Sequence, residues 1–254
     1  PGRDQKVNEM TKTELKENIT KINKLLRSDS YEAGIELIKT LDNPEIKKGT
    51  AKTVTAVIKK LLKQRDYDAI DTGIELARGL DEPSVFETLL DGCSIDKEGK
   101  LDRNKIFTGT DPAQPYLDYA LVNLIGYAPK DTKLDKSLEH SKVKKLDFYD
   151  YPWQKLPSGL GDFTNLTSLD LSNCNSLKNV DPLGNLSNIT TLNLGGCGSL
   201  QNVDGLSNLS NLDNLEMGFC TSLQNIDGLG NLAKLTSLDL SGCYFLKNID
   251  GLAN

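Results

Sequence analysis

Apolar positions in the second half of the chain recur every 23 residues. Within one repeat, Leu169 and Leu171 alternate with polar residues, which predicts a short strand with one buried face. Farther along, Leu183, Leu186 and Ile189 are spaced as in a 3₁₀ turn. A fixed period of this length predicts a solenoid in which each repeat buries its apolar side against its neighbours. The equivalent positions are Leu169, Leu192, Leu215 and Leu238; Leu171, Leu194, Met217 and Leu240; Cys174, Cys197, Cys220 and Cys243; Leu177, Leu200, Leu223 and Leu246; and Val180, Val203, Ile226 and Ile249.

The first 140 residues have a helical pattern instead. Leu15, Ile19, Ile22 and Leu26 have helical spacing, and Thr50 is a candidate N-cap for a later helix. The turn residues around 97–99 predict a hairpin. Helices are expected at 11–28, 31–41, 51–64, 66–80 and 83–90, from near Asp111 to 127, and at 135–141.

A second repeat lies within this helical region. Residues 34–44 match residues 73–83 at an offset of 39, and each copy ends in an acidic turn followed by proline. Paired helices with this period resemble HEAT or armadillo repeats. Two copies form a short series, so a plain small helical bundle is the alternative.

The second half resembles the leucine-rich-repeat family. Its pattern LxxLxLxxC stands in LTSLDLSNC and LTSLDLSGC, and TTLNLGGC and DNLEMGFC follow it closely. The segment NVDPLGNLSNI is similar to the back turns of bacterial internalins, although cysteine replaces the usual asparagine and the repeat is one residue longer. The resemblance implies an α+β chain. A helical domain over 1–140 caps a solenoid of about five repeats over 141–254, with a parallel sheet on its concave face.

The two ends of the solenoid differ from its middle. The first repeat has Tyr151 in place of the cysteine, and we expect Tyr151 and Trp153 to pack against the helices. The alternative is that part of this aromatic cluster is exposed as a binding hot spot. At the other end, Asn254 falls in the middle of a repeat, which suggests either that further repeats follow or that the chain is a fragment of a longer protein, and we favour the fragment.

No catalytic, metal or cofactor site is expected. The four cysteines of the repeat point inward as unpaired small apolar groups, and their spacing of 23 does not match the CxxC of zinc sites. His140 is the only histidine and has no nucleophile near it in the sequence. We therefore expect a binding module without enzymatic activity.

Charge and composition narrow the partner and the compartment. The net charge is −6, and residues from 141 onward contribute −4 from seven lysines and eleven acids. Neither half shows a concentrated basic face, so no nucleic-acid partner is expected. No apolar stretch reaches the roughly 20 residues of a membrane span. Five N-x-S/T sequences occur, and several lie on the packed back turns, where glycans would crowd the stacked repeats. This disfavours passage through the eukaryotic secretory pathway. A cytoplasmic protein or an exported bacterial protein, including a bacterial effector, is expected instead.

The outward positions of the strands are the candidate site. They form a column of acidic and polar residues that suits a basic or polar protein ligand, whereas a plain solvated face is the alternative. The alternative function is substrate recognition for a larger enzyme whose catalytic domain lies outside this chain. The oligomeric state is left open. The candidate ligand-binding residues are Asp147, Tyr149, Asp170, Asn193, Glu216, Phe219 and Asp239.

Overall fold

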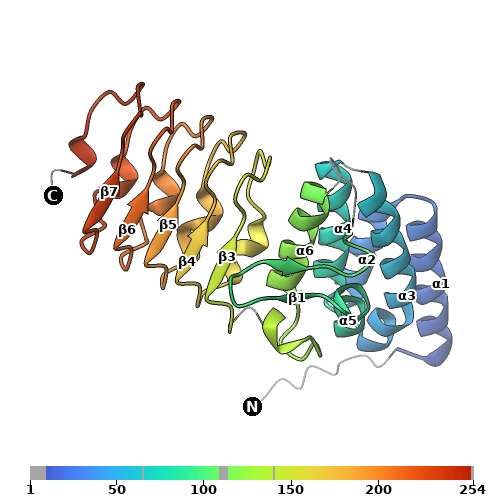
Figure 1. Ribbon diagram of the computed structural model, residues 1–254. Coiled ribbons are helices and arrows are strands. Elements are labelled where there is room, and N and C mark those ends of the chain that lie inside the picture. Colours follow the sequence, from blue (N-terminus) through green and yellow to red (C-terminus); the bar gives the residue numbers. More distant parts are fainter. Residues whose placement is uncertain (1–9, 65, 109–113, 140, 253–254) are drawn as a thin grey trace, which may run out of the picture.

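The chain folds into a helical region and a solenoid that pack side by side (Figure 1). The structure is a computed structural model that describes residues 10–64, 66–108, 114–139 and 141–252. His140 and the predicted helix start near Asp111 lie outside these residues. Within them, no helix is long and apolar enough to cross a membrane.

The helices form two layers. Helix α3 packs between α1 and α5 in one layer, and α4 packs between α2 and α6 in the other. The layers meet along α3 and α4, where Val54, Ile58, Ile70 and Ile74 are buried. The first layer is α1 (Lys12–Arg27), α3 (Pro44–Leu61) and α5 (Pro83–Leu90), and the second is α2 (Tyr31–Leu41), α4 (Tyr67–Leu80) and α6 (Gln114–Tyr127).

The 39-residue sequence repeat corresponds to a repeated helix pair. Helices α2 and α4 both end at an aspartate in the left-handed conformation, Asp42 with φ 35° and Asp81 with φ 50°. The next helix of each pair then begins at a proline, Pro44 or Pro83, whose missing N–H costs nothing at a first helical position. The two copies therefore share their helix–turn–helix boundaries.

The prediction that Thr50 caps the third helix is wrong. Helix α3 begins seven residues earlier than predicted, at Pro44, where Asn43 Oδ1 accepts hydrogen bonds from the backbone N–H groups of Glu45 at 2.9 Å and Ile46 at 3.3 Å. Thr50 is instead buried in the helix, and its hydroxyl donates to the carbonyl of Ile46. Asparagine followed by proline is the stronger start signal, because it satisfies the free amides and fixes the first φ.

A small hairpin and a 3₁₀ turn connect the two parts. Strands β1 (Ser94–Ile95) and β2 (Leu101–Asp102) pair antiparallel, and Gly99 occupies the turn with φ 90°. This confirms the predicted hairpin. The carbonyl of Gly99 accepts a hydrogen bond from the N–H of Asp147, so the hairpin lies against the first strand of the solenoid. The short 3₁₀ helices η1 (Leu62–Gln64) and η2 (Lys136–Leu138) complete this half.

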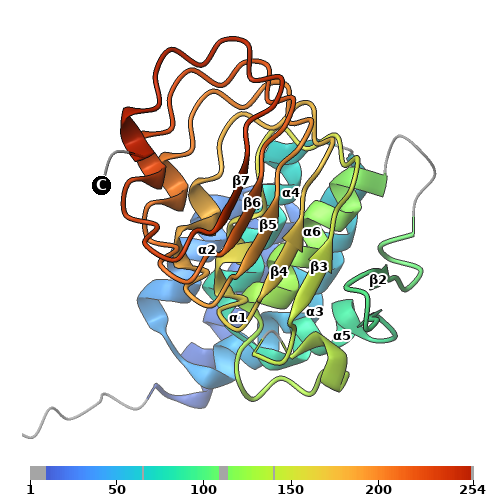
Figure 2. The same cartoon turned by 60° about the vertical axis from the view of Figure 1, so that its left-hand side comes forward.

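The solenoid has a parallel sheet on its concave side and 3₁₀ turns on the opposite side (Figure 2). Each strand residue pairs with its equivalent in the next repeat, so that Leu169 lies opposite Leu192. The apolar columns fill the space between the sheet and the turns. The predicted fold class is confirmed. The strands are β3 (Lys145–Asp147), β4 (Ser168–Asp170), β5 (Thr191–Asn193), β6 (Asn214–Glu216) and β7 (Ser237–Asp239), and the turns are η3 (Ser158–Asp162), η4 (Asp181–Asn185), η5 (Asp204–Leu206), η6 (Asp227–Leu229) and η7 (Asp250–Leu252).

The repeated asparagines of the back turns have a structural role. Asn202, Asn225 and Asn248 each accept the backbone N–H two residues ahead at 3.3 Å. That amide belongs to the first residue of a 3₁₀ turn, which has no partner within the turn. The repeated polar side chains therefore satisfy backbone groups that the turn itself leaves free.

The repeated cysteines form a ladder of weak hydrogen bonds. The thiols of Cys174, Cys197 and Cys220 are buried and unpaired, and each lies 3.2–3.4 Å from a backbone carbonyl oxygen of the preceding repeat. Cys243 makes the same contact but is only half-buried. Each thiol thus links two repeats while it fills the core, which confirms that these cysteines are packing groups.

We expect the ladder to make the fold sensitive to alkaline pH. Burial raises the pKa of Cys174 and Cys220 to about 12 and also raises that of Cys197, whereas an unfolded thiol titrates at about 8.5. The unfolded chain therefore loses protons first, so stability is complete below the unfolded pKa and falls as pH rises toward 12. Each such thiol contributes a loss of about 1.4 kcal/mol per pH unit in this window.

Urea unfolding of Cys197→Ala measures this contribution. The variant is less stable than the parent at pH 7, but its stability should fall less steeply between pH 9.5 and 11, by about one thiol's slope. Identical slopes for the parent and the variant would show that this thiol ionises in the folded protein.

An aromatic cluster joins the solenoid to the helices, as predicted for Tyr151 and Trp153. Trp153 is fully buried, and its ring lies edge-on to Tyr119 of α6 with the centroids 6.4 Å apart. Phe148 and Tyr151 pack on the same indole, each with its ring centroid 4.8 Å away. Tyr149 is the exception, because 57% of it is exposed. The degenerate first repeat is therefore built for contact with α6.

Candidate functional site

The polar face of the sheet is formed by the residues on either side of each buried central leucine. In the parallel register, Asp147, Asp170, Asn193, Glu216 and Asp239 align in one column, as predicted. The first three of these residues are half-buried, whereas the last two are exposed. The exposed carboxylates of this column are therefore those of Glu216 and Asp239.

Most members of this column also stabilise the turn after their strand. Asp170 Oδ1 accepts the backbone N–H of Ser172 at 2.8 Å, and Asp239 Oδ1 accepts that of Ser241 at the same distance. Asp147 and Asn193 accept the equivalent N–H of the residue two positions ahead. Among the described residues, Glu216 makes no such bond, and its longer side chain is exposed to solvent. The hydrogen bond from Ser241 lowers the pKa of Asp239, so this carboxyl is ionised at neutral pH.

A row of left-handed residues runs along the edge of the same face. In each repeat, the residue before the cysteine position has φ between 61° and 75°. Glycine, asparagine and aspartate tolerate this conformation, but a bulky side chain in it is strained by about 1–2 kcal/mol. Phe219 is the exception to the usual residue types in this row. The row consists of Asp150, Asn173, Gly196, Phe219 and Gly242.

Phe219 combines backbone strain with exposure. It has φ 61°, and 61% of it is exposed. Its ring lies over Gly242 of the next repeat, where an added Cβ would come within 2.7 Å of the ring. A glycine at that position therefore makes room for the phenyl group. Nothing in the core requires an aromatic side chain at this position, because the ring lies outside the apolar columns.

Tyr149 is the other exposed aromatic residue of the predicted site. Its hydroxyl accepts a hydrogen bond of 2.9 Å from Asn173 Nδ2, which holds the ring against the second repeat. Tyr149 and Phe219 are three repeats apart, a separation of roughly 15 Å at the usual strand spacing. Gly195 and Gly218 lie between them on the face and keep its centre shallow. The arrangement is an open acidic surface with an aromatic residue toward each end.

A model of the R13L1/DRL21 LRR family matches residues 129–197, which include β3, β4 and β5. These are the strands in which the LxxLxLxxC pattern and the one-repeat register coincide. The solenoid is a leucine-rich-repeat domain. The leucine-rich-repeat fold supports a protein-interaction module. A search of curated proteins found no match.

Leucine-rich-repeat proteins are also found among the solved structures similar to this chain. A Leptospira interrogans protein is 23% identical with a TM-score of 0.28; the alignment covers 40% of this chain and 32% of that protein, so the match spans about a third of its length. Internalin C2 of Listeria monocytogenes is 21% identical with a TM-score of 0.30, covering 68% and 80% of the two chains. Internalin F of the same species is 16% identical with a TM-score of 0.29, covering 70% and 69%.

The strands carry five of the seven predicted site residues. The other two, Tyr149 and Phe219, lie in the turns just after β3 and β6, at the edge of the face. The prediction did not anticipate the left-handed conformation of Phe219, although the aspartate, asparagine and glycine at the equivalent positions indicate it. No group of three or more histidine, cysteine, aspartate or glutamate side chains that could hold a metal ion occurs among the described residues.

Proposed function

We propose that the concave leucine-rich-repeat face binds a basic or polar protein ligand, and that Phe219 is the principal apolar anchor. The observation that carries this proposal is the conformation of Phe219. A phenylalanine is strained in the left-handed region, whereas Gly196 and Gly242 occupy the same position in the flanking repeats without strain. A residue that is exposed and also costs stability is best explained by a role in binding.

The electrostatics of the face support a ligand with a positive or polar surface. Glu216 and Asp239 are exposed beside Phe219, and no described cation lies within 4 Å of either carboxylate. Exposed carboxylates without a cation partner, placed beside an aromatic ring, suit a lysine or arginine of a partner protein. The negative charge steers association, and the ring contributes apolar contact area. The open, shallow surface favours a protein over a small molecule, which needs a concave pocket.

Neutralising the acidic column tests the proposal without damaging the turns. Asn193 already makes the turn hydrogen bond with an amide, so Asp170→Asn and Asp239→Asn should retain theirs. We combine these with Glu216→Gln and immobilise the variant and the parent for affinity capture. We expect the variant to lose the proteins that the parent captures, because the charge that steers and pairs with the ligand is gone.

A matched control removes the same charge from the opposite side of the repeats. The triple variant Asp181→Asn, Asp204→Asn and Asp227→Asn changes exposed residues of the back turns. It should capture the same proteins as the parent. If the concave variant retains every captured protein, the acidic column is not the binding site.

Phe219→Gly separates the anchor from the charge. The substitution relieves the left-handed strain, so we expect the free energy of unfolding to rise by about 0.5–1 kcal/mol after the extra freedom of glycine in the unfolded chain is counted. The same variant should bind the captured ligand at least tenfold more weakly, which titration calorimetry can measure. Unchanged affinity would remove Phe219 from the site.

A further inference from the structure

Lysines gather on a solvent-exposed ridge of helix α3, in the helical region of the chain. Lys48, Lys52 and Lys59 follow one another at one- and two-turn spacing; the first two are exposed and Lys59 is half-buried. Residues 10–64 contain twelve basic and seven acidic side chains, a net charge of +5, so the rest of the chain carries −11 of the total of −6. The charge of each half of the chain did not indicate this ridge, because helical spacing gathers charges that a regional count averages out.

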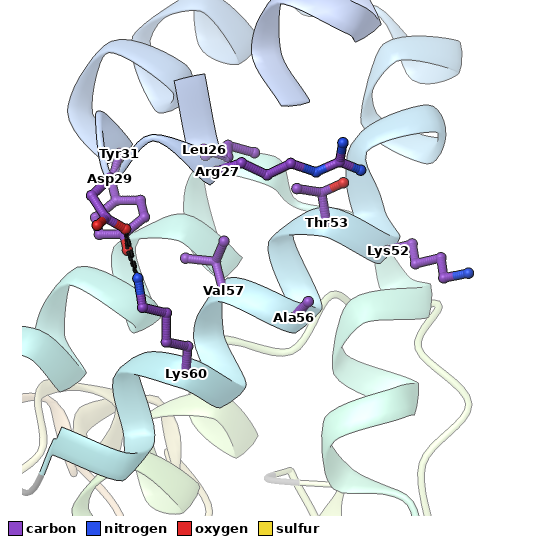
Figure 3. Close-up of a pocket in the computed structure, with 9 residues that line it drawn as sticks. All are labelled: Leu26, Arg27, Asp29, Tyr31, Lys52, Thr53, Ala56, Val57 and Lys60. Atoms are coloured by element: carbon purple, nitrogen blue, oxygen red, sulfur yellow. Dashed lines mark hydrogen bonds and ion pairs between the residues drawn. The ribbon is translucent and has the colours of Figure 1, made fainter. Parts of the chain in front are cut away.

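Two hollows flank this ridge. One lies between α1 and α3, has a volume of about 420 Å³, and has the apolar side chains of Leu26 and Val57 in its lining (Figure 3). The other lies between α3 and α5, has a volume of about 540 Å³, and is lined partly by Ala51 and Thr88. Ala56 belongs to both linings. Because the side chain of Ala56 is small, little side-chain volume separates the two hollows at this position.

The cations around the hollows are largely uncompensated. Lys60 pairs with Asp29 at 2.8 Å, and Figure 3 shows this contact, whereas it draws no partner for Arg27 or Lys52. No hydrogen bond or ion pair joins the side chains of Arg27, Lys48, Lys52 or Lys59 to another described residue. The two linings together contain five cations and a single carboxylate, that of Asp29.

This combination fits an acidic protein segment better than a nucleic acid. The hollows offer apolar and hydroxyl surface to partner side chains. The linings contain one aromatic ring, that of Tyr31, which is half-buried and whose hydroxyl donates to Asp29, whereas single-stranded nucleic acids are usually bound by several stacking rings. Four of the five cations are lysines, which bind phosphate as point charges without the bidentate geometry of arginine. A long polyanion would also be repelled by the charge of −11 on the rest of the chain.

We propose that the surface formed by α1, α3 and α5 docks an acidic segment of a protein partner. In this arrangement, carboxylates of the segment pair with Arg27, Lys48, Lys52 and Lys59, and its apolar side chains enter the two hollows on either side of Ala56. The segment binds independently of the concave leucine-rich-repeat face. The protein would therefore have two docking surfaces of opposite charge, one on each of its two parts.

A displayed library of random 16-residue peptides provides the probe. The full chain selects peptides in low salt, and the triple variant Lys48→Glu, Lys52→Glu and Lys59→Glu is used to remove peptides that bind elsewhere. We expect the remaining peptides to be enriched in aspartate and glutamate around two or more apolar residues. Fluorescence anisotropy should then show at least a tenfold weaker affinity for the triple variant, and the same loss for Ala56→Trp, which closes the gap between the hollows without changing charge.

The control carries the same charge change away from this surface, as Lys105→Glu, Lys130→Glu and Lys136→Glu, and should bind like the parent. Circular dichroism verifies that each variant is folded. Selected peptides that bind the Lys48, Lys52 and Lys59 variant as tightly as the parent would overturn the proposal. So would a selection without acidic enrichment, or a 16-base-pair DNA duplex that binds the parent when no peptide does, because the surface would then be a nucleic-acid site.

Discussion

Asp118→Ala is expected to lower the free energy of unfolding by about 3–5 kcal/mol, the usual cost of removing one partner from a buried ion pair. The Asp118 carboxylate is 1% exposed on α6 and accepts two hydrogen bonds from the Arg103 guanidinium, the one to Nη2 measuring 2.8 Å. It also accepts from the Tyr151 hydroxyl at 2.9 Å and from Gln114 at 2.8 Å. The alanine variant therefore leaves a partly buried guanidinium without its counter-charge.

The network explains why this single residue has such a large effect. Arg103 follows the hairpin strand β2, Asp118 lies on α6, and Tyr151 belongs to the first repeat. One carboxylate thus joins three segments that are distant in sequence. Guanidinium chloride unfolding, followed by circular dichroism, measures the loss.

Two further variants show whether charge or hydrogen bonding dominates at Asp118. Tyr151→Phe keeps the ring packed on Trp153 and removes only the hydroxyl, so it should cost about 1–2 kcal/mol. The pair Arg103→Met and Asp118→Leu removes both charges and should recover much of the stability lost by Asp118→Ala. A loss below 1 kcal/mol for Asp118→Ala would show that water replaces the carboxylate at this junction.

Gly126→Ala is expected to destabilise the protein by about 2–3 kcal/mol. This loss is expected even though alanine is a better helix former than glycine by about 1 kcal/mol. Gly126 is buried near the end of α6, where the helix packs against η3. A Cβ at this position would lie 2.1 Å from the carbonyl oxygen of Gly159. A backbone atom cannot rotate away, so the helix and the first repeat would have to separate.

Gly73→Ala is the matched control for this prediction. Gly73 is also buried in a helix, α4, but its added Cβ would meet its nearest atoms at an ordinary 3.7 Å. The control should therefore be neutral or stabilising by up to about 1 kcal/mol. Urea unfolding of both variants gives the comparison. If Gly126→Ala also proved stabilising, the contact between α6 and η3 would not hold the two parts together.

Much of the solenoid could be predicted from the sequence because its contacts are repetitive. Leu192, Cys197 and Leu206 face the same surroundings as their equivalents one repeat away, so the 23-residue period contains both the strand positions and the packing. The first and last residues of the helices were harder to predict. The start of α3 was missed because Thr50 is a common capping residue, whereas Asn43 and Pro44 satisfy the helix end more completely.

The candidate site was only partly predictable. The outward column follows from strand alternation, and five of the predicted residues lie on the strands. That Asp170 and Asp239 also hold turns follows from the local backbone path, which alternation does not specify. The lysine ridge was readable in principle from the spacing of Lys48 and Lys52, but a count of charge by region conceals it.

The sequence by itself determined the repeat, the buried cysteine column and the acidic strand face, because each depends on neighbours at a fixed distance along the chain. Only the tertiary structure decided how the helices meet the repeats. Arg103, Asp118 and Tyr151 come together across as many as 48 residues, and Gly126 reaches Gly159 across 33. No periodicity relates these positions. Their contacts exist only once α6 has packed against the first repeat. That packing buries Asp118 beside Arg103 and brings the backbones at Gly126 and Gly159 too close together for a larger side chain.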